Sequence, residues 1–130
     1  MFIKLIFTIL LCISTNTTWA RPNIKACWDR VSKDSTYYPM KIDKVTTIIG
    51  TMCREENGRA IYIYQNQLAS DKAGASTQKE IDSLKVEVLP MACSDPNTLP
   101  LLKLIDMEYA YYDMKGKYIG RFTLQIEDCK

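Results

Sequence analysis

Four cysteines in residues 21–130 restrict the possible folds of this chain more than any other part of its sequence. They are Cys27, Cys53, Cys93 and Cys129, and a fifth cysteine lies in the first 20 residues. An even set of cysteines in a small exported domain is typical of a disulfide framework. Metal binding is disfavoured because no Cys-x-x-Cys pair occurs and the chain has no histidine. The sequence therefore predicts two disulfides and no bound metal.

Residues 1–20 predict the export that such a framework needs. Lys4 makes a short positive start, residues 5–13 form an apolar core, and a more polar stretch closes at Ala20. This order matches a secretory signal peptide, and the apolar core falls short of the roughly 20 residues that span a bilayer as a helix. We expect cleavage after Ala20, one α+β domain over residues 21–130, and a periplasmic or secreted location without membrane insertion.

The spacing of residues in the first half of this domain indicates a helix followed by a β-hairpin. Apolar residues recur at helical spacing over residues 22–34, and Trp28 shares their stripe, so we place its side chain in the core. Segments 44–54 and 59–68 are rich in β-branched and aromatic residues and predict strands. Asn57-Gly58 between them is a strong signal for a hairpin turn.

The second half indicates two helices and a second hairpin. Thr77 and Glu80 have the form of a capping box that starts a helix, and Pro90 is expected to end it. The remaining elements are a short helix after Asp95 and strands over 107–113 and 117–128. The order α-β-β-α-α-β-β predicts an α+β fold, with a four-stranded, mostly antiparallel sheet made of two hairpins and helices packed on one face.

The four cysteines allow three pairings, and their spacing alone selects none of them. Cys93 precedes the short helix that leads into the last hairpin, and Cys129 ends that hairpin, so the returning strand brings the two close together. Cys27 lies on the inward stripe of the first helix, and Cys53 ends the first strand. These positions favour Cys93–Cys129 together with Cys27–Cys53.

The absence of histidine excludes several kinds of catalytic site. Ser-His-Asp and Cys-His nucleophiles both need it, and no nucleotide-binding motif is present. Carboxylate pairs remain, and we interpret the candidates, Asp106 with Glu108 and Glu127 with Asp128, as solvated turn and strand-end residues. The net charge is only +2, without a run of like charges, so no nucleic-acid partner is expected. The chain is predicted not to be an enzyme and to carry no cofactor.

Tyrosines are the positive feature of the sequence. Tyrosine favours strands, so one interpretation is packing within the sheet. The other is an aromatic surface that binds a partner with little loss of conformational entropy. Alternation along the last strand places Tyr118 on the same face as Phe122 and Leu124. The candidate binding residues are Tyr62, Tyr64, Tyr109, Tyr111, Tyr112 and Tyr118.

The segment from Cys93 to Cys129 follows the frame C-x-D-P … L-L … Y-x-Y-x-D-x-x-G-x … C. This frame resembles small exported proteins of Gram-negative bacteria, among them a family described as quorum-sensing-regulated virulence factors. Residues 39–47 resemble the segment that leads into the first strand of these proteins. The resemblance implies an α+β periplasmic or secreted domain, supports the Cys93–Cys129 pairing and transfers no catalytic residue. Cys27 and Cys53 lie outside the shared frame.

Together these features predict a non-enzymatic exported protein that binds another protein or an envelope component. Two forms of this function are a virulence-associated factor and an inhibitor or immunity protein for an envelope hydrolase. The alternatives are an accessory protein of a secretion or pilus assembly, and a carboxylate-based hydrolase. A cleft with convergent carboxylates would favour the hydrolase, whereas a tyrosine-rich face or a protruding loop would favour a binding protein.

Overall fold

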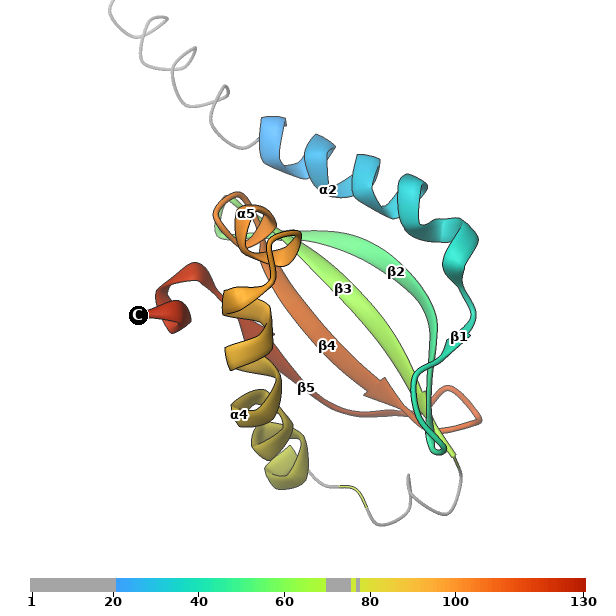
Figure 1. Cartoon of the computed structure of the whole chain (residues 1–130). Coiled ribbons are helices and arrows are strands. Elements are labelled where there is room, and N and C mark those ends of the chain that lie inside the picture. The colour runs from blue at the N-terminus through green and yellow to red at the C-terminus, as the bar shows by residue number, and fades with distance from the viewer. Residues whose placement is uncertain (1–20, 70–75, 77) are drawn as a thin grey trace, which may run out of the picture.

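The computed structural model describes residues 21–69, 76 and 78–130. A helix, a hairpin with a short extra strand before it, two helices and a second hairpin follow one another (Figure 1). The elements are α2 (Arg21–Asp34), η1 (Ser35–Tyr37), β1 (Met40–Lys41), β2 (Thr46–Glu56), β3 (Arg59–Leu68), α4 (Gln78–Ser94), α5 (Thr98–Leu102), β4 (Asp106–Tyr112), β5 (Tyr118–Leu124) and η2 (Ile126–Cys129). The predicted signal peptide and the predicted helix cap Thr77 lie outside the described residues.

Five strands form one mixed sheet in the order β1-β2-β3-β4-β5. Three neighbouring pairs are antiparallel, whereas β3 and β4 are parallel. The α+β class and the two hairpins are confirmed, but the predicted number of four strands is wrong. β1 is only two residues long, too short for a periodic pattern to reveal it. The parallel pair forms because α4 and α5 lie between β3 and β4 in the chain, and a connection of this length can return the chain in the same direction.

The predicted Asn-Gly turn closes the first hairpin. Asn57 and Gly58 have φ angles of 52° and 76°, and Glu56 pairs with Arg59 on either side of them. Positive φ at both central residues is what a two-residue hairpin turn needs for its twist to match that of the strands. Gly116 in the second turn also has a positive φ, 84°, which a residue with a side chain rarely adopts.

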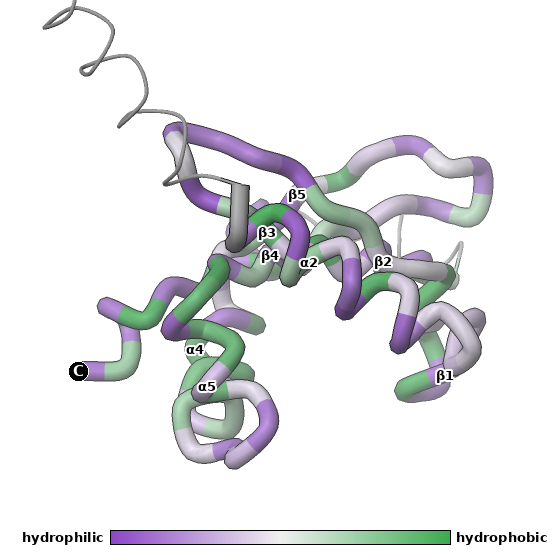
Figure 2. Tube along the Cα trace, turned by 90° about the horizontal axis from the view of Figure 1, so that it is seen from above, coloured by the Kyte–Doolittle hydropathy of each residue, from purple (hydrophilic) through white to green (hydrophobic). Residues whose placement is uncertain are grey.

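The helices cover one face of the sheet. α2 packs on β2 and β3, and α4 packs on β5; Figure 2 shows α4 and α5 extending to one side of the strands. The main core joins Cys27 of α2 and Ile81 of α4 to sheet residues such as Tyr62. The opposite face, here called the open face, has a small cluster of its own, made of strand residues around Ile61 and Ile63.

A β-bulge in the second hairpin changes which side chains face the core. Tyr111 pairs with Gly120, but the next residue, Tyr112, pairs with Tyr118, so β5 contains one extra residue. An extra residue reverses the alternation of a strand. Tyr118 is therefore 51% exposed, and its predicted place on the core face beside Phe122 is wrong.

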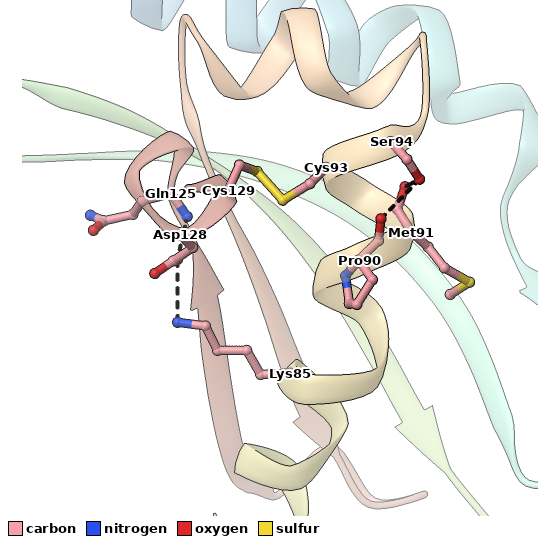
Figure 3. Close-up of a disulfide and its surroundings, with 8 residues drawn as sticks. All are labelled: Lys85, Pro90, Met91, Cys93, Ser94, Gln125, Asp128 and Cys129. Atoms are coloured by element: carbon pink, nitrogen blue, oxygen red, sulfur yellow. Dashed lines mark hydrogen bonds and ion pairs between the residues drawn. A yellow bond between two sulfur atoms is a disulfide. The ribbon is translucent and has the colours of Figure 1, made fainter.

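α4 continues through Pro90 to Ser94, so the prediction that this proline ends the helix is wrong. Proline removes one backbone N–H bond from a helix. The turn that follows is held by Ser94 Oγ, which donates to the Pro90 carbonyl oxygen at 2.8 Å, and by the disulfide of Cys93 (Figure 3). These contacts hold the last turn of α4 beyond the proline.

Both predicted disulfides are present. Cys27–Cys53 ties α2 to β2, and Cys93–Cys129 ties the end of α4 to η2 (Figure 3). Their Cα–Cα distances are 6.1 Å and 5.5 Å, within the usual range for disulfides. The Cys27–Cys53 bond also determines how α2 is rotated about its axis.

Trp28 is 47% exposed, so its predicted place in the core is wrong. Neighbouring residues on a helix are separated by about 100° around its axis. Cys27 is fully buried by its bond to Cys53, which turns the next side chain toward the edge of the interface. Ile24 and Val31 of the same predicted stripe do pack against the core.

Candidate functional site

An apolar groove runs along the inner side of α4. Its larger part is a hollow of about 460 Å³ between α4 and the end of the sheet where β1 meets β2. Ile81, Leu84 and Val88 line it from α4, and their spacing places them on one face of that helix. Leu68 and Tyr111 line it from the sheet. The other lining residues are Ile42, Asp43, Val45, Thr46, Ser76 and Glu80.

A second hollow, of about 220 Å³, continues this space toward α5. Val88 lines both hollows, and on the sheet side the lining passes from Tyr111 to Tyr109, two positions earlier on β4. The other residues of the second hollow are Met91, Ala92, Asp95 and Thr98. We call the two hollows together the α4 groove. It exists because α2 packs on β2 and β3 while α4 packs on β5, so the helices leave part of the sheet between them uncovered (Figure 1).

Two carboxylates lie at the larger hollow. Asp43 accepts hydrogen bonds from the N–H groups of Val45 at 2.8 Å and Thr46 at 2.7 Å. Slight burial opposes ionisation, but these hydrogen bonds outweigh it and lower the pKa of Asp43. Glu80 of α4 lines the same hollow. An apolar groove with anionic groups at its border suits a segment that carries apolar side chains and a basic residue.

Aromatic rings form a row across β3, β4 and β5 on the helix-covered face. Their centroids are 5.0 Å apart for Tyr62–Tyr64, 4.9 Å for Tyr64–Tyr109 and 4.7 Å for Tyr109–Phe122. Burial raises the pKa of both Tyr109 and Tyr111 to about 12. The sheet side of the α4 groove is therefore lined by aromatic rings that stay neutral at physiological pH.

The six tyrosines proposed from the sequence do not form one surface. Tyr62, Tyr64, Tyr109 and Tyr111 pack with the main core, whereas Tyr112 and Tyr118 lie together on the open face with centroids 5.8 Å apart. Tyr62 and Tyr111 are buried, and only Tyr118 is largely exposed. Tyr109 and Tyr111 are the two that line the α4 groove. A role for the partly exposed tyrosines in binding stays a prediction.

The sequence did not identify the α4 residues that line the groove. Ile81, Leu84 and Val88 have a clear helical spacing, but a helix packed tightly on a sheet gives the same pattern. The space beside them depends on how far α2 and α4 lie apart on the sheet. That distance is set by contacts between distant parts of the chain.

The open face carries two buried carboxylates beneath three arginines. Asp106 and Glu108 are each only 3% exposed, so their interpretation as solvated residues is wrong. Arg59 binds Asp106 through Nε at 3.0 Å and Nη2 at 2.7 Å. Glu108 Oε1 accepts from Arg54 Nη2 at 2.7 Å and from Arg121 Nη1 at 3.1 Å. The arginines come from β3, β2 and β5, and a pattern along one strand does not reveal such partners.

These side chains border a cleft of about 310 Å³, which we call the arginine cleft. The hydrogen bond to Glu108 raises the pKa of Arg54, and the bond to Asp106 raises that of Arg59. Both carboxylates are occupied by guanidinium donors, so neither is placed to act as a general acid or base. Within the described residues, no group of three or more acidic, cysteine or histidine side chains could hold a metal ion.

Comparison with known proteins gives a likeness of fold. No family model matches the sequence, and no curated protein matches it significantly. A candidate secreted protein from Pseudomonas aeruginosa is similar with a TM-score of 0.73 and 16% identity, over 88% of this chain and 98% of that chain. The type II secretion system pilotin EpsS from Vibrio vulnificus has a TM-score of 0.64 and 15% identity, and the pilotin AspS from Vibrio cholerae 0.60 and 15%. Each pilotin match covers 85% of this chain and 94% of the other.

These likenesses show a fold that also occurs in type II secretion pilotins. No helix in the part of the chain that the structure describes is both long enough and apolar enough to cross a membrane. The structure thus presents two sites of different character: an apolar groove on the helix-covered face and a charged cleft on the open face.

Proposed function

We propose that this chain is an exported accessory protein of a secretion assembly in the cell envelope, and that it binds a segment of another protein in the α4 groove. The observation that carries this proposal is the apolar groove on a fold that two type II secretion pilotins also have. The two disulfides agree with an oxidising compartment outside the cytoplasm.

The dimensions and lining of the α4 groove fit apolar side chains of a partner. Each leucine-sized side chain that becomes buried there contributes about 1.5–3 kcal/mol before the entropy of association is subtracted. Asp43 and Glu80 at the larger hollow favour a basic residue beside the apolar ones. The partner segment is therefore expected to be apolar on one side and to carry a lysine or arginine.

Catalysis has less support than binding. A carboxylate-based hydrolase needs a carboxylic acid and a carboxylate that face a substrate. Asp106 and Glu108 lie instead on the open face, away from the α4 groove, and are bound by arginines. Neither the fold nor the groove specifically favours an inhibitor or immunity protein, or the virulence association that the resemblance implies.

Photo-crosslinking in the cell envelope tests the proposal. A photoreactive phenylalanine analogue is placed at Leu84, which lines the groove, and in a control at Glu87, which is exposed on the same helix. The full chain is expressed with its leader in a Gram-negative host that has a type II secretion system. We expect position 84 to capture a component of that assembly and position 87 to capture none.

Two valines of α4 provide a matched pair for a pulldown of the captured component. Val88 lines the groove, whereas Val86 is 74% exposed on the outer side of the helix. Val88→Asp is expected to weaken capture at least about tenfold, equivalent to 1.4 kcal/mol, and Val86→Asp to leave it unchanged. If Val88→Asp does not fold, Val88→Thr replaces it in the same pulldown, because threonine keeps the shape of the valine side chain. Equal capture at positions 84 and 87, or equal effects of the two valine changes, would overturn the proposal.

A further inference from the structure

We infer that the arginine cleft is a second binding site, which takes carboxylate side chains from an acidic segment of a partner protein. This goes beyond the proposed function, and rests on it only in that the ligand is part of a protein. The cleft is lined mainly by strand residues of the open face, with Lys85 of α4 at its border, whereas the α4 groove lies on the helix-covered face, and the two share no lining residue. The two sites can therefore be occupied, and fail, independently.

The guanidinium groups of the cleft are held in place before any ligand arrives. Glu108 binds Arg54 and Arg121 with one carboxylate, and Asp106 binds Arg59 in a bidentate pair. Because the two carboxylates are almost fully buried, they are themselves fixed in place and hold the arginines above them. Donors fixed in this way lose less entropy when they bind a ligand than mobile side chains do.

Some donors of these arginines remain available to a ligand. A guanidinium has five N–H groups in a planar fork, which matches the two oxygens of a carboxylate. Arg121 uses only Nη1, so its Nε and Nη2 groups have no hydrogen-bond partner among the described residues. Arg54 likewise has a free Nε group, and Arg59 a free Nη1 group, with respect to those residues.

The two carboxylates at the centre of the cleft lie deeper than the arginines that they bind. The side chains of Arg54, Arg59 and Arg121 are 36%, 43% and 47% exposed, whereas those of Glu108 and Asp106 are 4% and 5% exposed. Two further charged side chains border the cleft: Lys85, which is paired with Asp128, and Glu56, which is 52% exposed and bound to Arg54.

A protein segment fits this cleft better than a free small anion does. The volume of about 310 Å³ is much larger than a single phosphate needs, and Ile61 and Thr123 line it beside the charged groups. An apolar contact of this kind suits the methylene groups of glutamate side chains. Several carboxylates on one chain also add their interactions with the separate arginines.

Peptide titrations followed by NMR of the arginine Nε–H signals test the inference on the complete exported protein. The probe is N-acetyl-hexaglutamate amide at low salt, and hexaglutamine is its uncharged counterpart. We expect hexaglutamate to shift the signals of Arg54, Arg59 and Arg121 to saturation, and hexaglutamine to shift none. Added salt should weaken the binding because the arginines are partly exposed.

Arg121→Gln is the informative variant because Glu108 keeps its bond to Arg54, so the fold is retained; thermal unfolding checks this. We expect at least about tenfold weaker binding of hexaglutamate, with Arg121→Lys in between. The matched control is Arg30→Gln on α2, which also loses an ion pair, with Asp34 at 2.7 Å, but lies outside the cleft.

The possible outcomes separate this inference from its rivals and from the proposed function. An absent shift, or an equal loss in Arg30→Gln, overturns it. Inorganic phosphate that binds as tightly as hexaglutamate also overturns it, because the cleft would then be a simple anion site. Val88→Asp should leave hexaglutamate binding unchanged, so a failure of the α4 groove and a failure of the arginine cleft are distinguishable.

Discussion

The helix-covered face of the sheet buries its row of aromatic rings under α2 and α4, whereas the open face covers Ile61 and Ile63 with side chains of its own strands. On the first face, burial comes from packing and is reinforced by Cys27–Cys53. On the second, two buried carboxylates hold arginines across four strands. One sheet thus uses apolar packing on one side and charge pairing on the other.

This difference determines which kind of site each face offers. Here α2 packs on β2 and β3 and α4 packs on β5, so apolar surface stays accessible between them as the α4 groove. Ion pairs that close a sheet face leave unused guanidinium donors pointing to solvent, because a guanidinium has more donors than one carboxylate accepts. The helix-covered face therefore favours apolar ligands, and the open face favours anions.

Removal of Cys27–Cys53 should give the largest effect, and should loosen α2 more than the rest of the fold. The chain-entropy argument assigns about 3–4 kcal/mol to a loop of this length, and replacing both cysteines by alanine should lower the free energy of unfolding by that amount. Denaturant unfolding measures the loss. Hydrogen exchange should become faster in β4 and β5 because the whole fold is less stable, and faster still in α2, because this bond ties α2 to the sheet and its loss lets that helix open by itself. Equal acceleration in α2, β4 and β5 would contradict a separate stabilisation of the two faces.

Alkaline pH should weaken the helix-covered face next. The pKa of Tyr109 and of Tyr111 is about 12 in the folded protein, against about 10 in an unfolded chain. Their contribution to the free energy of unfolding is complete below about pH 10. It is lost as the pH rises toward 12, because the two phenol groups lose their protons at lower pH in the unfolded chain than in the folded protein. At pH 11 the two should together lower the free energy of unfolding by roughly 2–3 kcal/mol.

Phenylalanine substitutions test this assignment. Changing both Tyr109 and Tyr111 to phenylalanine should reduce the alkaline loss by roughly 2–3 kcal/mol in denaturant unfolding at pH 8 and pH 11. The loss that remains is assigned to Tyr62 and Tyr64, whose pKa burial also raises. Tyr118→Phe is the control, because that side chain is largely exposed on the open face. An alkaline loss that the double variant leaves unchanged would mean that other groups cause it.

Local sequence patterns predicted the elements of both hairpins and the cysteine pairing. β3 has the predicted bounds, and the Asn57-Gly58 turn forms as expected, because residues close in sequence determine turn geometry. The two disulfides followed from the order of elements, since a returning hairpin brings Cys129 back to the end of α4. The predicted helix over residues 22–34 was correct in place, though not in the direction of Trp28.

Features that depend on distant contacts were not predicted. The bulge in β5 depends on pairing with β4 and moves Tyr118 to the open face. The arginine partners of Asp106 and Glu108 lie on other strands, so these carboxylates looked solvated when the segment was considered alone. The α4 groove depends on the positions of two helices on the sheet. The last two features belong to the candidate sites, and none of the three has a local pattern.

Glu108→Gln tests the contribution of charge pairing on the open face. The change removes the carboxylate shared by Arg54 and Arg121 and should lower the free energy of unfolding by about 1–2 kcal/mol. This loss is smaller than that for a fully buried ion pair, because water can reach both arginines. Glu55→Gln, at an exposed position of β2, is the control and should change stability by no more than about 0.5 kcal/mol. Equal effects of the two changes would show that the open face does not depend on its ion pairs.

Trp28→Ala should have the smallest effect and defines where the covered face ends. A tryptophan in the core costs about 3–5 kcal/mol when it is replaced by alanine, whereas a side chain as exposed as Trp28 should cost only about 1 kcal/mol. Phe122→Ala, at a buried position of the aromatic row, gives the loss in free energy of unfolding for a core aromatic residue in the same denaturant experiment. The other tryptophan, Trp19, lies in the predicted leader, so the fluorescence of the processed chain comes from Trp28 alone and should be red-shifted and readily quenched. A blue-shifted, protected emission together with a loss near 3 kcal/mol would place Trp28 in the core after all, and would mean that α2 lies on the sheet in a different rotation.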